Sequence, residues 1–112
     1  MKETIFSIMQ WHADTFPDAT LDDQLEKYQE EQREWVESGE KDITELADMF
    51  IVACGIARFD LWEGAHAIWD VYEWMDDGRV SPKKVFKTVD KKMKINRKRT
   101  WHKENGLYKH DK

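Results

Sequence analysis

The 112-residue chain predicts an all-α fold, a bundle of about four to five helices around one central apolar helix. Apolar residues recur at spacings of three and four along most of the sequence, and no alternating strand pattern competes with them. Both prolines, Pro17 and Pro82, fall at breaks between these periodic segments. The length predicts one domain over residues 1–112, and because so small a core is modest, we expect an oligomer.

The first two helices are predicted at about residues 3–15 and 20–38, with a turn around Pro17 between them. Thr20 is a good N-cap, and two acidic residues in the following turn favour the positive end of the helix dipole. Ser38-Gly39 ends the second helix, because glycine readily adopts the left-handed conformation found there. Its apolar stripe comprises Leu21, Leu25, Tyr28, Trp35 and Val36.

A third helix over residues 42–58 is apolar almost all round, which predicts the central and most buried position. A fourth helix follows at residues 61–75, and a fifth begins at Ser81-Pro82 and continues to about residue 99. The remaining residues, 101–112, form a polar tail with aromatics. The apolar side of the fourth helix comprises Trp62, Ala65, Ile68, Trp69 and Tyr72, and that of the fifth comprises Val85, Phe86, Val89 and Met93.

The charge is divided unequally along the chain. Residues 1–80 carry 6 Lys and Arg against 20 Asp and Glu, a net charge of −14, whereas residues 81–112 carry 12 against 3, a net charge of +9. The basic segment could bind nucleic acid. Alternatively, it could fold over an acidic metal site and hold the phosphates of a small ligand.

The single cysteine, Cys54, lies in an apolar run and predicts a buried, inert thiol. With no second cysteine an internal disulfide is excluded, and a reducing cytoplasmic setting is the simplest expectation. No signal peptide is visible, and no stretch approaches the ~20 apolar residues of a membrane span.

Two short clusters of acidic residues carry the strongest functional signal. Glu31 and Glu34 lie one turn apart on the second helix, and Glu45 and Asp48 have the same spacing on the third. The connecting loop is short, so the helices should run antiparallel and bring four carboxylates around one point. Asp48 is the only charge in residues 46–57, so we expect it to be buried and met by a cation.

Oxygen ligands of this kind favour Mg²⁺ or Mn²⁺ over zinc. Such a site predicts metal-assisted hydrolysis at phosphorus, in which a spare carboxylate orients or deprotonates a water. Two structural alternatives remain open. Glu45 could complete a capping box with Asp42, and Glu31 and Glu34 could form solvated pairs with Lys27 or Arg33.

Among the aromatic residues, Trp11 and Trp101 lie in the more polar surroundings and are candidates for stacking on a base. Most other tryptophans are expected in the core. The histidines His12, His102 and His110 have a spacing that supports no zinc site.

The pattern E-E-x-x-E at residues 30–34 followed by E-x-x-D at residues 45–48 resembles the MazG-like nucleoside triphosphate pyrophosphohydrolases of the all-α NTP pyrophosphatase superfamily. The resemblance spans about residues 5–110. Two further segments carry it, namely Trp11-His12 with Phe16-Pro17-Asp18-Ala19-Thr20, and Lys92-Met93-x-x-Asn96-x-x-Arg99-x-Trp101 with Gly106 and His110.

This resemblance implies that the acids at positions 31, 34, 45 and 48 bind Mg²⁺ and that Glu30 is an accessory acid positioning water. It implies that Lys92, Asn96 and Arg99 contact the triphosphate or sugar, with Trp11, His12 and Trp101 as further substrate contacts. The implied reaction is hydrolysis of a (deoxy)nucleoside triphosphate at the α–β link to a monophosphate and pyrophosphate. Dimers or tetramers are typical of the family, whereas residues 59–80 match no family motif.

Two other classes of function compete with the enzyme. The first is a non-catalytic helical module that binds nucleic acid through residues 81–112, although the acidic body would repel a polyanion. The second is a protein-interaction module of the helical-bundle type, with its acids on the surface. Base and sugar specificity cannot be predicted from this sequence.

Overall fold

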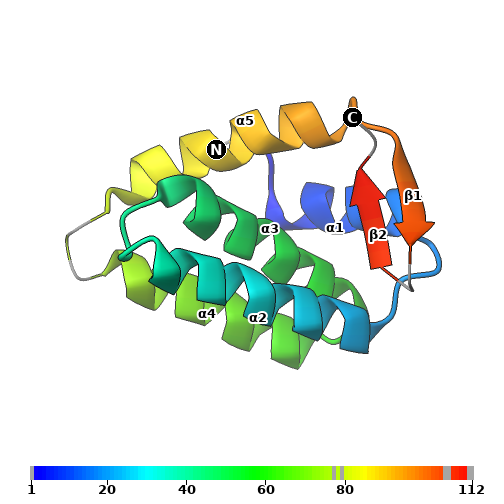
Figure 1. Ribbon diagram of the computed structural model, residues 1–112, viewed down its shortest axis with the longest axis horizontal. Helices are drawn as coiled ribbons and strands as arrows, with labels where there is room; N and C mark the ends of the chain where they lie inside the picture. The colour runs from blue at the N-terminus through cyan, green and yellow to red at the C-terminus, as the bar shows by residue number, and fades with distance from the viewer. Residues whose placement is uncertain (1, 77, 79, 105–106, 111–112) are drawn as a thin grey trace.

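Five helices make up the body of the protein (Figure 1). The computed structural model describes all residues except 1, 77, 79, 105–106 and 111–112, and it leaves out the side chains of 103 and 107–110. The predicted helical body is confirmed, with a Cα radius of gyration of 13.2 Å. The helices are α1 (Ile5–Thr15), α2 (Leu21–Glu37), α3 (Ile43–Phe59), α4 (Leu61–Met75) and α5 (Pro82–Asn96).

Local capping chemistry explains where these helices begin. The Thr20 hydroxyl accepts from the Asp23 backbone N–H while the Asp23 side chain accepts from that of Thr20, which forms a capping box. Ser81 caps α5, whose first turn holds Pro82. Gly39, with φ of +77°, follows the end of α2 as predicted.

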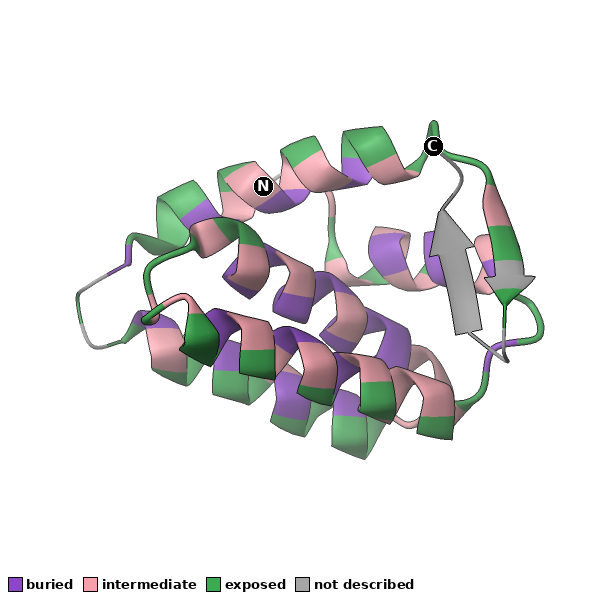
Figure 2. Ribbon diagram, viewed as in Figure 1, coloured by how far each residue is buried: buried purple, intermediate pink, exposed green. Residues whose placement is uncertain are grey.

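Helix α3 is the centre of the bundle, and the other four helices pack around it (Figure 2). Ten of its residues are buried, so the prediction of a central apolar helix is confirmed. Cys54 is fully buried there, and burial raises its pKa to about 12, which keeps the thiol protonated.

Helix α4 packs through a different face from the predicted one. Its buried residues are Gly64, Ala67, Val71 and Met75, whereas Trp62 is 72% exposed and Trp69 is also exposed. The prediction of the aromatic face was therefore wrong. The glycine at position 64 lets α4 approach the α3 backbone at Ala57 closely, which a larger side chain would prevent.

The tail differs from the prediction as well. Helix α5 ends at Asn96, and strands β1 (Trp101–Glu104) and β2 (Leu107–His110) pair antiparallel, with Trp101 opposite His110. The hairpin stands at the end of the bundle beside α1 (Figure 1). The Trp101 indole N–H donates to the Asn96 carbonyl at 3.3 Å, which ties the hairpin to the last turn of α5. Among the described residues, no helix combines the length and apolar character needed to cross a membrane.

Candidate metal centre

Helices α2 and α3 run antiparallel, and their register sets the position of the acidic residues (Figure 1). The carboxyl of Glu34 interacts with that of Glu45, and one turn further along the carboxyl of Glu31 interacts with that of Asp48. Each step toward the start of α2 is matched by an equal step toward the end of α3, as expected for antiparallel helices joined by a short loop. The carboxyl groups of α2 therefore approach those of α3, as the residue spacing on the two helices predicted.

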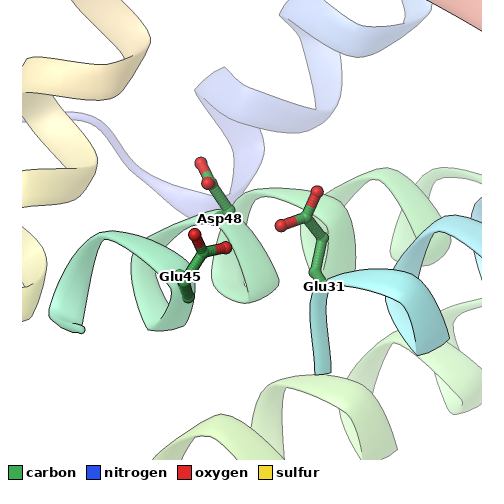
Figure 3. Close-up of side chains that lie close together, drawn as sticks. All are labelled: Glu31, Glu45 and Asp48. Atoms are coloured by element: carbon green, nitrogen blue, oxygen red, sulfur yellow. The ribbon is translucent and has the colours of Figure 1, made fainter. Parts of the chain in front are cut away.

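Three carboxylates converge between the two helices (Figure 3). Glu31 on α2 and Glu45 and Asp48 on α3 each offer one oxygen, and these oxygens lie within 4.8 Å of one another. The Glu31 side chain is only 9% exposed. Within the described residues, Oε2 of Glu31 and Oε2 of Glu45 are buried without a hydrogen-bond partner. Unpartnered buried oxygens are costly, so the cluster fits a cation that would satisfy them.

Glu34, the fourth expected ligand, lies outside this group of three oxygens. Its side chain instead shares a hydrogen bond with the carboxyl of Glu45. A hydrogen bond between two carboxyl groups needs a proton on one of them, because carboxylates only accept. The contact with Glu34 therefore favours the protonated form of Glu45, which is the direction in which the pKa of Glu45 is shifted.

The pKa values of the cluster are raised. Burial, followed by the charge of Asp48, raises the pKa of Glu31 to about 7 despite the opposing charge of Lys27. Burial, followed by the hydrogen bond with Glu34, raises the pKa of Glu45 to about 7. The pKa of Asp48 is also raised by burial, although Lys92 lowers it in part. Glu31 and Glu45 therefore hold protons near neutral pH unless a cation replaces them.

Two lysines flank the cluster. Lys27 Nζ lies 3.3 Å from Glu31 Oε1, and Lys92 Nζ lies 3.2 Å from Asp48 Oδ2. The expectation that Asp48 is met by a cation is thus fulfilled by Lys92. Asp48 is less buried than expected, since its side chain is 27% exposed. The reason is that Asp48 faces a cavity rather than a packed helix.

A cavity of about 580 Å³ extends from the acidic cluster to the hairpin end of the bundle. Its acidic end includes Glu31 and Asp48, with Lys27, Lys92 and Glu30 beside them. The Glu30 side chain is 42% exposed and lies 3.9 Å from the amine of Lys27. Acidic and basic groups therefore share one end of a single cavity.

Aromatic side chains line the other end. The rings of Trp11 and Trp101 meet edge to face with centroids 6.1 Å apart, and Trp101 meets Phe16 in the same way at 5.0 Å. Trp11 is more buried than expected, although it still lines the cavity. The two tryptophans that were expected to stack on a base are thus brought together, at the end of the cavity away from the carboxylates.

The remaining expected substrate contacts lie at the rim or wall of the same cavity. Asn96 and Arg99 line it at the end of α5, with Arg99 exposed to solvent. The Asn96 amide contacts the sulfur of Met93 at 3.9 Å. Gly106 and the side chain of His110, which belong to the family resemblance, fall outside what the structure describes.

His12 is buried in this wall, and sequence reasoning missed both residues that hold it. Arg58 Nη1 lies 3.0 Å from His12 Nδ1 and also donates to the carbonyl of Phe16 at 2.8 Å. A hydrogen bond also joins His12 to Gln24. Burial, together with the charge of Arg58, lowers the pKa of His12 to about 4, so the ring is neutral. An arginine in the last turn of α3 was a signal for contacts with carbonyls nearby.

Comparison of the chain with protein-family models, curated proteins and solved structures yields no match. The site is therefore defined by its own geometry, a carboxylate cluster at one end of a cavity in a helical bundle and aromatic rings at the other.

Proposed function

We propose that the protein is an Mg²⁺-dependent hydrolase that cleaves a (deoxy)nucleoside triphosphate at the α–β phosphate link. The observation that carries the proposal is the cavity with carboxylates and lysines at one end and tryptophans at the other. The two ends of a nucleotide match the two ends of this cavity, since the phosphates bind cations and the base stacks on a flat apolar surface.

The ligand chemistry supports Mg²⁺, or Mn²⁺, over zinc. The three converging side chains offer only carboxylate oxygens, and two of their oxygens are buried without partners. Mg²⁺ prefers a few carboxylates, keeps several waters and is completed by substrate phosphates. Zinc sites instead favour nitrogen and sulfur ligands. In this proposal Glu31, Glu45 and Asp48 hold the ion, and Glu34 orients Glu45.

When bound, Mg²⁺ would neutralise phosphate charge and lower the pKa of a coordinated water. Lys92 and Arg99, which line the same cavity, would bind the phosphates, with Asn96 contacting the sugar or a phosphate. Glu30 lies beside Glu31 at the acidic end and would orient the attacking water and accept its proton. The choice of the α–β link follows the resemblance of the acidic motifs to MazG-like pyrophosphohydrolases.

A product analysis tests this function. Purified protein is incubated with the eight common NTPs and dNTPs, with and without Mg²⁺, and the products are separated. Monophosphate plus pyrophosphate, formed only with metal, is expected. Diphosphate plus phosphate would place the cleavage at the other link, and no turnover of any nucleotide would contradict the proposal.

A second candidate is nucleic-acid binding by the basic segment. It is favoured by one observation, namely that lysines of α5 are exposed on its outer side. These are Lys83, Lys84, Lys87, Lys91 and Lys94. Binding of this kind would weaken steeply with salt and would be lost when these lysines are changed. The acidic cluster has no part in such binding, so the nucleotide function is the better supported.

Self-association is a further part of the proposal. The outer face of α4 exposes Leu61, Trp62 and Trp69, and exposed apolar patches commonly mark contacts between proteins (Figure 2). A homodimer or homotetramer would cover this face. Light scattering during gel filtration measures the mass directly, and a monomer at all concentrations would contradict it.

A further inference from the structure

The hydrogen bonds around His12 fix one more property of the cavity. Arg58 Nη1 lies 3.0 Å from His12 Nδ1. A guanidinium group can only donate, so Nδ1 must be the accepting nitrogen and the ring proton must sit on Nε2. The tautomer of His12 is therefore set by Arg58.

The same reasoning fixes the amide of Gln24. Gln24 Oε1 and His12 Nε2 lie against the same point at Gly55, and the Nε2–H donor needs an acceptor, so it faces the amide oxygen of Gln24 rather than the amide nitrogen. Rotating the amide by half a turn would bring two donors face to face, which is unfavourable. Gln24 therefore keeps its NH₂ group pointing away from His12. Within the described residues, that group donates no hydrogen bond.

Gly55 makes room for this arrangement. A Cβ at position 55 of α3 would lie 2.8 Å from Gln24 Oε1 and 3.0 Å from His12 Nε2. The first contact is shorter than real Cβ atoms show and the second is tighter than most, so a side chain at position 55 would displace Gln24 or His12. The lack of a side chain at position 55 of α3 thus leaves the space that His12 and Gln24 occupy.

Gln24 lines the same cavity as Trp11 and Trp101. It precedes Glu31 on α2 by two helical turns, about 10 Å along the same face. A nucleotide whose phosphates reach the acidic cluster would bring the edge of its base near Gln24. This step rests on the proposed function.

We propose that Gln24 is a specificity-determining residue that donates to the base and selects bases carrying a carbonyl oxygen over those carrying an amino group. An unconstrained glutamine could turn to suit either base. This one presents donors only, so uracil, thymine or a 6-oxopurine would be paired, whereas the amino group of cytosine or adenine would meet a second donor.

Equilibrium binding to two matched ligand pairs tests the proposal. The probes are α,β-methylene triphosphates, which resist cleavage at the α–β link, of deoxyuridine against deoxycytidine and of inosine against adenosine. Calorimetry with Mg²⁺ measures the ratio of Kd values within each pair. The wild type should prefer the oxo member of at least one pair by about tenfold.

Two variants locate this preference at Gln24. Gln24→Glu keeps the acceptor for His12 but presents an oxygen to the cavity, so the preference should reverse toward the amino member. Gln24→Met removes both functions and should bring the ratio close to one. Gln29→Glu is the matched control, since it makes the same change on the exposed side of α2 and should keep the wild-type ratio. Because the ratio is taken within a pair, the added charge cancels.

The outcomes separate this proposal from the proposed function. Equal binding of both members by the wild type, no binding of any probe, or an unchanged ratio in Gln24→Glu would overturn the role of Gln24. Turnover of natural triphosphates with an unchanged ratio would overturn it while leaving the hydrolase intact. A ratio that reverses as expected, in a protein that cleaves no triphosphate, would support Gln24 and refute the hydrolase.

Discussion

Lys92 Nζ lies 3.2 Å from Asp48 Oδ2, joining α5 to α3 across 44 positions of the sequence. The lysine comes from the basic segment and the aspartate from the acidic body, so the division of charge along the chain becomes a contact in space. In the absence of metal, the amine offsets part of the negative charge of the cluster. A divalent ion must therefore compete with Lys92 for Asp48, and the lysine is then free for a phosphate.

Lys92→Gln should separate these two roles. In the absence of substrate, the Kd for Mg²⁺ should fall by at least about threefold, because a competing positive charge near Asp48 has been removed. The KM for a triphosphate should rise, since a phosphate ligand is lost. Calorimetric titration with Mg²⁺ and steady-state kinetics measure the two effects. Lys91→Gln, an exposed neighbour on α5, is the control. Weaker Mg²⁺ binding by Lys92→Gln would argue against competition.

Asp48→Asn should abolish turnover while leaving the fold intact. It removes one of the three converging carboxylates, so the loss of kcat should be at least about a hundredfold. Stability should not fall much, because the change also relieves repulsion within the cluster. Pyrophosphate release and thermal melting are measured side by side, with Glu26→Gln on the exposed side of α2 as the control. An active Asp48→Asn variant would remove the metal assignment.

The starts of α2 and α5, the end of α2 and the acidic register were predictable because they depend on local chemistry. A threonine before an acidic turn, a serine before a proline and a glycine after a helix each act within four residues. A short loop between two amphipathic helices leaves little choice but antiparallel packing. The meeting of Glu31 and Asp48 follows from these rules and needs no knowledge of the other helices.

The packing face of α4 was not predictable in this way, because both of its sides are apolar. The aromatic side gives the stronger hydrophobic signal, yet the side with Gly64 and Ala67 lets two backbones approach. That preference depends on the shape of α3. The hairpin, in contrast, had a local signal that the helical interpretation passed over, since Asn-Gly at positions 105–106 separates two short runs that become strands.

The cavity could not be predicted from the sequence, because its shape depends on where three separate elements end. Trp11 on α1 and Trp101 on β1 meet only because the hairpin folds back along the end of the bundle. The pairing of Arg58 with His12 crosses 46 positions and has no periodic signature. The chemistry of Trp11, Trp101 and His12 made them candidates from the sequence, but their positions relative to one another could be seen only in the folded structure.

The stability of the metal-free protein should fall as pH rises. Glu31 and Glu45 have pKa values near 7 in the folded state against an ordinary 4.5. Between these values the folded state holds protons that the unfolded chain has released, so the free energy of unfolding decreases with increasing pH. Because Glu45 is partly exposed and solvent screens its interactions, the loss should be on the order of 2 kcal/mol between pH 5 and pH 8, less than the full shifts of both groups would give.

Melting temperatures from pH 5 to pH 8, with and without Mg²⁺, measure this effect. Mg²⁺ should raise the melting temperature most at pH 8, where the carboxylates are ionised and no proton competes. Glu31→Gln should show a shallower pH dependence and a smaller response to the ion. A metal-free melting temperature that is flat over this range would contradict the raised pKa values.

Gly64→Ala should destabilise the protein even though alanine is the better helix former. A Cβ at position 64 would lie 2.3 Å from the Cα of Ala57 and 2.6 Å from its backbone nitrogen. Backbone atoms cannot turn aside as a flexible side chain can, so α3 and α4 would have to move apart. The gain of about 1 kcal/mol in helix propensity is then outweighed, and we expect a net loss of about 2 kcal/mol.

Urea unfolding measures this loss, and His66→Ala, at an exposed position of the same helix, is the control that should change stability little. Because α4 supplies no residue to the cavity, Gly64→Ala protein that remains folded should keep its Mg²⁺-dependent turnover. A stabilised variant would mean that the contact between α3 and α4 is looser than its geometry implies. Loss of turnover in folded protein would instead show that strain at this contact reaches Asp48 through α3.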